Sequence, residues 1–144
     1  MERTTSQRKA IQSAIEEAGR PLSPPEIHAA ARLRAPGLGM ATVYRAINRL
    51  LDDGVLTAVE LPGEAPRYER AGLGHHHHFR CGGCNKVFDF FGCTNGFERY
   101  APEGFALERH ELFLFGRCVV CSTLRSRPAT APCSPPSVIA SMSG

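Results

Sequence analysis

Two cysteine pairs in the second half of the sequence have the spacing of metal ligands. They are Cys81-Gly-Gly-Cys84 and Cys118-Val-Val-Cys121, separated by residues 85–117. A C-x-x-C on a tight turn directs two thiolates at one tetrahedral ion, and a second pair completes the four ligands. Four thiolates leave no open position, so the pattern predicts a structural zinc site. The alternative is a redox dithiol or disulfides, but thioredoxin-like motifs place one C-x-x-C at a helix start after a strand, which neither pair shows.

Four consecutive histidines, His75 to His78, directly precede the first cysteine pair. Alternate residues of a strand face opposite sides, so His76 and His78 would point one way and His75 and His77 the other. Two imidazoles on one face can start a metal site, so each face of the strand is a candidate. One alternative is a solvated polar strand. The other is an expression-tag remnant, which the internal position and the adjoining cysteine motif argue against.

The distribution of cysteine and histidine separates the chain into two parts. Of 6 Cys and 6 His among 144 residues, only His28 precedes position 75. No apolar run approaches the roughly 20 residues that span a bilayer, and no secretory signal follows the charged start. We therefore expect a cytoplasmic protein whose thiols stay reduced and bind metal. Cys93 and Cys133 lie outside the two pairs, and we expect each to be a free thiol.

Three helices are expected before the metal-binding part. Ser6 is the expected N-cap of the first, which has an apolar face and ends at Gly19. A capping box of Ser23, Pro24 and Glu26 begins the second. The third covers residues 40–53 and ends at Gly54; its apolar stripe is Val43, Ile47, Leu50 and Leu51.

Short strands follow these helices. Residues 55–61 are rich in β-branched side chains and predict a strand, and residues 67–70 predict a second strand after a P-G-E-A-P turn. This hairpin completes a winged helix-turn-helix. Further strands are expected at 77–81, 86–91 and 111–118, with a short helix at 95–101. The fold class is therefore α+β. Residues 126–144 are rich in Ser and Pro, with no acidic residue, and predict a disordered tail.

Three motifs in this order resemble the ferric uptake regulator family: A-T-V-Y-R-A-I-N-R-L-L-D-D-G (41–54), H-H-H-H-F-R-C-G-G-C (75–84) and H-E-L-F-L-F-G-R-C-V-V-C (110–121). The match runs from about residue 3 to residue 125. The resemblance implies a winged-helix DNA-binding domain at 1–70, a hinge at 71–74, and a small α/β metal-binding dimerisation domain at 75–125 before the tail at 126–144. Such proteins are dimeric, metal-activated repressors.

The resemblance also implies roles for individual residues. The structural zinc ligands would be Cys81, Cys84, Cys118 and Cys121. A regulatory site would hold a second divalent metal through Glu69, His76, His78 and Asp89. A further site would use His75, His77, Glu98 and His110. DNA contacts would come from Arg3, Thr42, Tyr44, Arg45 and Arg49.

The chain departs from the family in three places. Pro21 stands where many members carry a histidine of the regulatory site. No cysteine precedes Cys81, although zinc sensors often use one there, so the regulatory donors are all N and O and suit iron(II), zinc or manganese. The segment from Asp89 to Gly104 is short, which predicts a dimerisation helix of about two turns.

These features predict a metal-responsive repressor of metal-homeostasis genes, such as iron or zinc uptake genes. It would bind a double-stranded DNA operator as a metal-loaded homodimer, with no membrane and no small organic substrate as partner. Net charge is +3, and residues 1–66 are neutral overall, so local placement of Arg45 and Arg49 must carry DNA binding. A zinc buffer or chaperone that reads no DNA is the alternative. A zinc-dependent hydrolase is less favoured, because no H-E-x-x-H motif is present, and we expect no enzyme activity.

Overall fold

The computed structural model describes residues 2–93 and 95–123 and divides into two compact units between Leu73 and Gly74. The predicted tail and Cys133 lie outside the described residues. Along the described chain, no helix has the length and apolar character needed to cross a membrane. Each unit is described by itself below.

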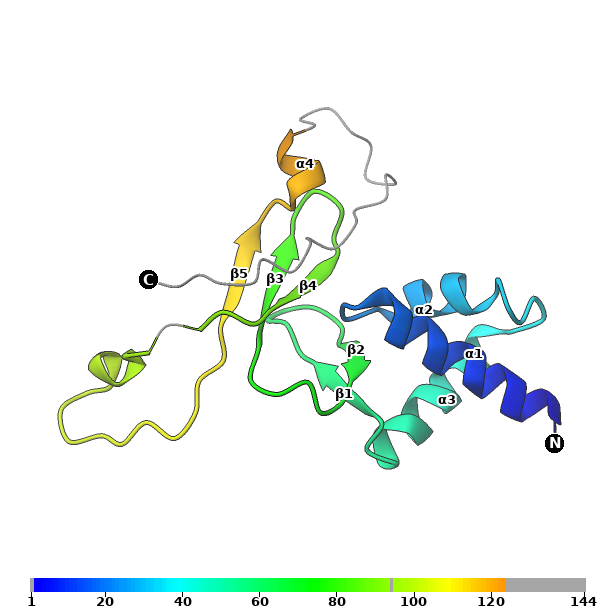
Figure 1. The fold of residues 1–144 in the computed structure, drawn as a ribbon, viewed down its shortest axis with the longest axis horizontal. Coiled ribbons are helices and arrows are strands. Elements are labelled where there is room, and N and C mark those ends of the chain that lie inside the picture. Colours follow the sequence, from blue (N-terminus) through cyan, green and yellow to red (C-terminus); the bar gives the residue numbers. More distant parts are fainter. Residues whose placement is uncertain (1, 94, 124–144) are drawn as a thin grey trace. The chain divides into compact units, whose positions relative to one another are not determined.

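The first unit contains three helices and a hairpin (Figure 1). The helices are α1 (Glu2–Ala18), α2 (Pro24–Ala31) and α3 (Met40–Asp52). Strands β1 (Leu56–Val59) and β2 (Arg67–Arg70) pair antiparallel, with Leu56 opposite Arg70. Backbone hydrogen bonds between Leu22 and Tyr68, 2.8 and 2.9 Å long, tie the segment before α2 to the hairpin. This is the predicted winged helix.

The helix boundaries follow local chemistry, with one correction. Ser23 caps α2: its hydroxyl accepts from the Glu26 amide, and the Glu26 carboxylate accepts from the Ser23 amide at 3.2 Å. The prediction that Ser6 caps α1 is wrong. It lies inside the helix, because its hydroxyl donates to the Arg3 carbonyl at 3.0 Å and so leaves the helical backbone intact.

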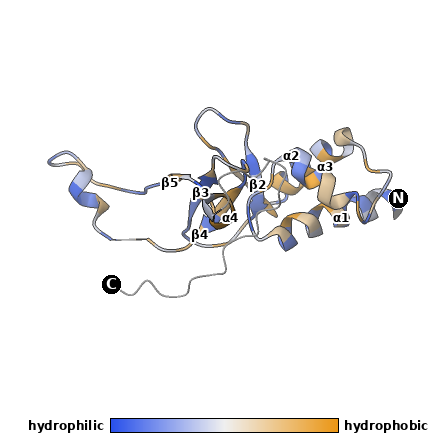
Figure 2. Ribbon diagram, turned by 90° about the horizontal axis from the view of Figure 1, so that it is seen from above, coloured by the Kyte–Doolittle hydropathy of each residue, from blue (hydrophilic) through white to orange (hydrophobic). Residues whose placement is uncertain are grey.

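An apolar core holds the first unit together. The hydropathy colours of Figure 2 show hydrophobic residues along its helices. Buried residues of the three helices and the hairpin form one cluster. Ile11, Ile27, Val43, Ile47 and Leu50 are each at most 1% exposed. Leu51, predicted in the α3 stripe, packs against this cluster while only partly buried. The α3 stripe faces the core, which leaves the opposite face of α3 to solvent.

The second unit is built on a three-stranded sheet in the order β4-β3-β5. The central strand β3 (His77–Cys81) pairs antiparallel with β4 (Val87–Phe90) and parallel with β5 (Phe113–Gly116). A short helix, α4 (Val119–Thr123), follows β5. The fold class is α+β, as predicted.

The predicted two-turn helix at 95–101 is instead a single 3-10 turn, η1 (Phe97–Tyr100). The reason is local. Pro102 disfavours a helical conformation in the residue before it, and Ala101 is extended, with ψ at 143°. The long connection between β4 and β5 (Figure 1) therefore carries little regular structure.

Candidate metal centres and nucleic-acid interface

The four cysteines of the two C-x-x-C motifs meet at one point of the second unit. All four Sγ atoms lie within 4.8 Å of one another, and those of Cys84 and Cys118 are 4.0 Å apart. Zinc bound to four thiolates at about 2.3 Å in tetrahedral geometry separates the sulfurs by about 3.8 Å. The donor set therefore fits a structural zinc ion.

Strand β3 and the start of α4 position these thiols. Cys81 ends β3 and is 0% exposed, Cys118 directly precedes α4, and Cys121 lies within α4. Burial raises the pKa of the Cys81 thiol, but hydrogen bonds from backbone N–H groups, that of Cys118 first, outweigh it and lower the pKa to about 6. The backbone thus prepares Cys81 as a thiolate ligand.

Gly83, inside the first C-x-x-C motif, lies too close to Cys121 for a larger residue to fit. A Cβ on this residue would lie 2.8 Å from both the Cβ and the Sγ of Cys121. Real Cβ atoms do not tolerate such a distance, so any larger residue would push the second cysteine pair away from the first. Gly83 is therefore needed for the two cysteine pairs to meet.

A second group lies on one face of β3. His78 pairs in register with Asp89 of β4, and its Nε2 is 3.2 Å from Asp89 Oδ1. His76 Nε2 is 3.8 Å from the same oxygen, and the two imidazole rings are 4.9 Å apart. Strand alternation thus brings together three of the four predicted regulatory ligands. The fourth, Glu69, lies in β2 of the first unit and is 3% exposed.

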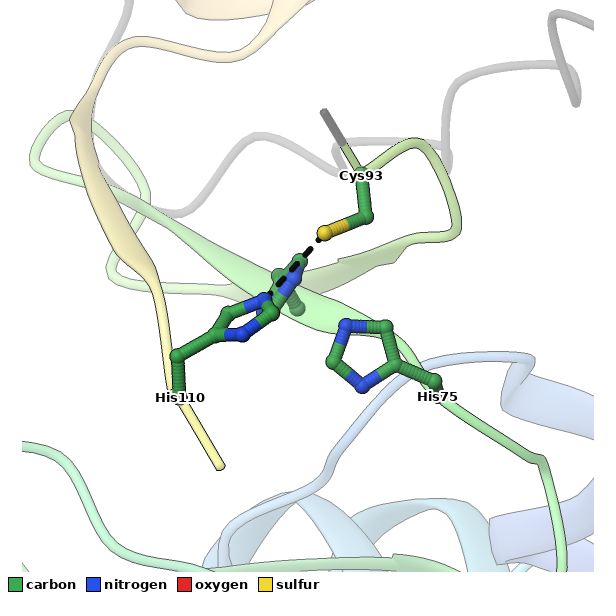
Figure 3. A group of neighbouring side chains, drawn as sticks. His75, Cys93 and His110 are labelled. Carbon is green, nitrogen blue, oxygen red and sulfur yellow. Dashed lines mark hydrogen bonds between the residues drawn. The ribbon is translucent and has the colours of Figure 1, made fainter. Parts of the chain in front are cut away.

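The opposite face of β3 carries a third group. The ring of His75 lies 4.6 Å from that of His77 and 4.8 Å from that of His110. Burial, followed by the neighbouring histidines with His75 first, lowers the pKa of His77, which is 2% exposed. Figure 3 shows Cys93 beside these rings, its Sγ 3.2 Å from His110 Nε2. One ligand atom from each of His75, His77, Cys93 and His110 lies within 4.8 Å of the others.

The positions of two residues near this third group differ from the sequence-based expectation. Glu98 is exposed on η1 and is not among the clustered ligands, because the short 3-10 turn presents Phe97, whose ring stacks on His110 at 4.5 Å. Cys93 was expected to be a free thiol rather than a ligand, and its sulfur lies among the clustered ligand atoms. The sequence feature that could have indicated this role is the position of Cys93, four residues after Asp89. It lies just beyond the end of a strand whose side chains face the histidines.

The predicted DNA-contacting residues lie on the solvent side of the first unit. Tyr44, Arg45 and Arg49 of α3 are exposed, and Thr42 is half-buried. The Arg45 guanidinium donates to Thr42 Oγ1 at 3.1 Å, which holds it toward the helix N-terminus. Arg3 is exposed in the first turn of α1.

Two further residues weighed from the sequence are accounted for by packing. His28 Nε2 bonds to the Leu38 carbonyl at 2.7 Å, which ties α2 to the turn before α3. Pro21 is among the fully buried side chains of the chain. The Nε2 atom of His28 is thus occupied, and the side chain of Pro21 has no donor atom for a metal.

The fold and the ligand groups together define a metal-binding winged-helix protein. The model of the ferric uptake regulator family matches residues 2–115, and the chain belongs to that family. Members of the family are metal-responsive transcriptional regulators and not enzymes, and they bind DNA as dimers.

Individual relatives agree with this membership. The ferric uptake regulation protein of Campylobacter jejuni is 27% identical over 130 residues, which cover 85% of this chain and 82% of the relative. That of Shigella flexneri is 35% identical over 85 residues, but these cover only 56% of this chain and 57% of the relative. The chain thus aligns with little more than half of that relative's length.

Solved structures show the same architecture. The Helicobacter pylori ferric uptake regulator, described as having three functional metal binding sites, is 28% identical with a TM-score of 0.62; the match covers 81% of this chain and 79% of that one. A zinc-bound manganese uptake regulator is 25% identical with a TM-score of 0.68, covering 78% and 88%.

Proposed function

We propose that this chain is a metal-responsive repressor that binds an operator as a homodimer in the cytoplasm and controls iron- or zinc-uptake genes. The observation that carries the proposal is the convergence of His76, His78 and Asp89 at 3.2 and 3.8 Å, a few residues beyond the boundary between the two units. A ligand group in that position can connect metal occupancy to the arrangement of a DNA-binding unit.

The exposed face of α3 supports the DNA-binding part. Arg45 and Arg49 are four residues apart and so project from one side of the helix. Asp53, at the other end of α3, is paired with Arg8 of α1, which reduces its repulsion of phosphate. We therefore place the N-terminal half of α3 in the major groove, with Tyr44 and Arg45 toward bases and other basic residues toward phosphate.

The surface of the second unit supports the homodimer. Large apolar side chains are exposed on it, among them Phe91 (53%), Tyr100 (70%), Phe105 (70%) and Phe115 (59%). Strand β5 is at one edge of the sheet, where its backbone groups can pair with another chain. Exposed apolar surface of this kind marks an interface, and a second copy would place two α3 helices about one DNA turn apart.

Metal control would follow from ligands on both units. The resemblance adds Glu69 of the first unit to His76, His78 and Asp89 of the second, so that all four would hold one divalent ion. These N and O donors suit iron(II), zinc or manganese. Such a site shifts the orientation of the units only by its differential affinity for the DNA-binding arrangement. Pro21 removes one family ligand and should weaken this coupling.

The test is DNA binding titrated with metal. Zinc-loaded protein first selects an operator from random duplexes, and binding is then measured with added iron(II), zinc or manganese. The double variant His76→Ala/His78→Ala should lose metal stimulation and keep the four-cysteine zinc. Stimulation of the wild type should fade below about pH 6.5, because a protonated imidazole cannot bind metal.

The matched control is His75→Ala/His77→Ala, which alters the opposite face of β3 and should have a smaller or separate effect. If this control silences the metal response and the 76/78 variant does not, the regulatory ion occupies the other group. If no duplex is selected under any metal, the protein is a zinc buffer or chaperone and the proposal is wrong.

A further inference from the structure

The third ligand group differs in chemistry from the one that the family resemblance implies. That resemblance supplies three histidines and the carboxylate of Glu98. In the structure, Glu98 is exposed on η1, and the thiol of Cys93 is the group that approaches the histidines. The change replaces a hard oxygen donor by a soft sulfur donor.

We propose that His75, His77, Cys93 and His110 form a three-histidine, one-cysteine site that takes zinc in preference to manganese. The four ligand atoms lie within 4.8 Å of one another. Tetrahedral zinc with nitrogen and sulfur ligands separates N from S by about 3.5 Å, and Cys93 Sγ is 3.2 Å from His110 Nε2. The remaining ligand atoms would have to move closer together around the ion, which rotation of the side chains allows.

The environment of His77 is a second, independent indication of a ligand. This side chain is 2% exposed, and its Nε2 is buried with no hydrogen-bond partner in the described chain. A buried imidazole nitrogen without a partner is costly, and a metal ion would satisfy it. Its ring lies 4.6 and 5.1 Å from those of His75 and His110.

A thiol beside an imidazole could instead be a nucleophile–base pair. Such a pair needs one base held by an orienting group. Here three imidazoles surround one thiol, whereas a nucleophile–base pair uses one. His110 is in contact with the ring of Phe97, on which it stacks. Three converging imidazoles and a thiol are the donors that zinc binds and that manganese binds poorly.

The test uses cobalt(II) as a coloured substitute for zinc, in full-length protein whose four-cysteine site is already filled with zinc. Cobalt bound to Cys93 gives a thiolate-to-cobalt charge-transfer absorption in the near ultraviolet, whereas cobalt on His76, His78 and Asp89 gives none. The wild type should show this band while retaining its zinc, and added zinc should abolish it at concentrations where manganese has no effect.

Cys93→Ser should lose the band, and metal affinity at this group should fall by about tenfold or more, since even outer-sphere changes cost that much. Glu98→Gln is the matched control and should behave as the wild type. The proposal is overturned if Cys93→Ser keeps the band, or if Glu98→Gln weakens binding and Cys93→Ser does not. Because Cys93 is exposed, its replacement should not disturb folding.

A second readout is chemical. Zinc should slow alkylation of Cys93 by iodoacetamide in the wild type, and the protection should be lost in His110→Ala. Equal alkylation with and without zinc would overturn the assignment. Neither experiment involves DNA, so this site can fail while the proposed repressor function stands, and the reverse also holds.

Discussion

The two units of this protein are held together by different means. The first buries a continuous cluster of aliphatic side chains from all three helices and the hairpin. The main buried cluster of the second is Cys81, Phe88, Cys118 and Cys121, so three of its four members are thiols. A domain whose core consists largely of cysteine has little apolar area to bury.

This difference has an energetic consequence. Full burial of an aliphatic side chain contributes about 1.5–3 kcal/mol, and the first unit has many such side chains. Structural zinc in small domains contributes roughly 10–16 kcal/mol of apparent binding free energy, all of it available to folding. The second unit should therefore depend on metal for its structure, and the first should not.

The largest expected effect is that of Cys118→Ser. Removing one thiolate should cost the zinc ion and, with it, the sheet of the second unit and the dimer. Zinc content and thermal melting measure this, with Cys93→Ser as a control that keeps the four-cysteine zinc. A Cys118→Ser protein with one tightly bound zinc per chain and wild-type melting would show that the cluster is not the structural site.

Ile47→Ala should affect the first unit alone. Ile47 is 1% exposed in the α3 stripe, and its truncation should lower the free energy of unfolding of that unit by about 2–5 kcal/mol. Denaturant unfolding followed on the helices measures this loss, while zinc content should not change. Leu33→Ala, at a residue 86% exposed, should stay within about 0.5 kcal/mol of the wild type. Loss of zinc in Ile47→Ala would contradict the independence of the units.

Arg45→Ala should have the smallest effect on stability. Its effect should be on DNA binding. The variant should weaken operator binding by about 1–3 kcal/mol if Arg45 reads a base, or lower the salt dependence by about one charge if it meets phosphate. Arg34→Ala is a suitable control, because Arg34 is already paired with Glu17 at 2.6 Å. If Arg45→Ala binds the operator with unchanged affinity at matched salt, α3 is not the helix that recognises the DNA.

The same contrast governs what could be predicted from the sequence. In the first unit, the apolar period and the cap residues Gly19 and Ser23 define the helices, because each signal acts within a few residues. Ser6 misled because serine can bond either to the end of a helix or within it. In the second unit, the spacing of the cysteines predicted that four thiols meet, and alternation predicted which of His75 to His78 share a face. Asp89 and His110 were assigned only by the family resemblance.

The connection between β4 and β5 was beyond this kind of reasoning. It has no apolar period, so nothing in the pattern indicates which of its residues returns to the sheet. Pro102 limits η1 to one turn, and Cys93, rather than Glu98, lies among the histidines of the third group. A ligand supplied by an irregular loop depends on the path of that loop, and here only the three-dimensional structure provides it.

The most direct test of the difference between the units is amide hydrogen exchange of the full chain before and after zinc is removed by a chelator. We predict that amides of β3, β4 and β5 lose their protection when zinc is removed, while those of α1, α2 and α3 keep it. Protection of the β3–β5 sheet that survives complete removal of zinc, or equal loss in both units, would contradict this account.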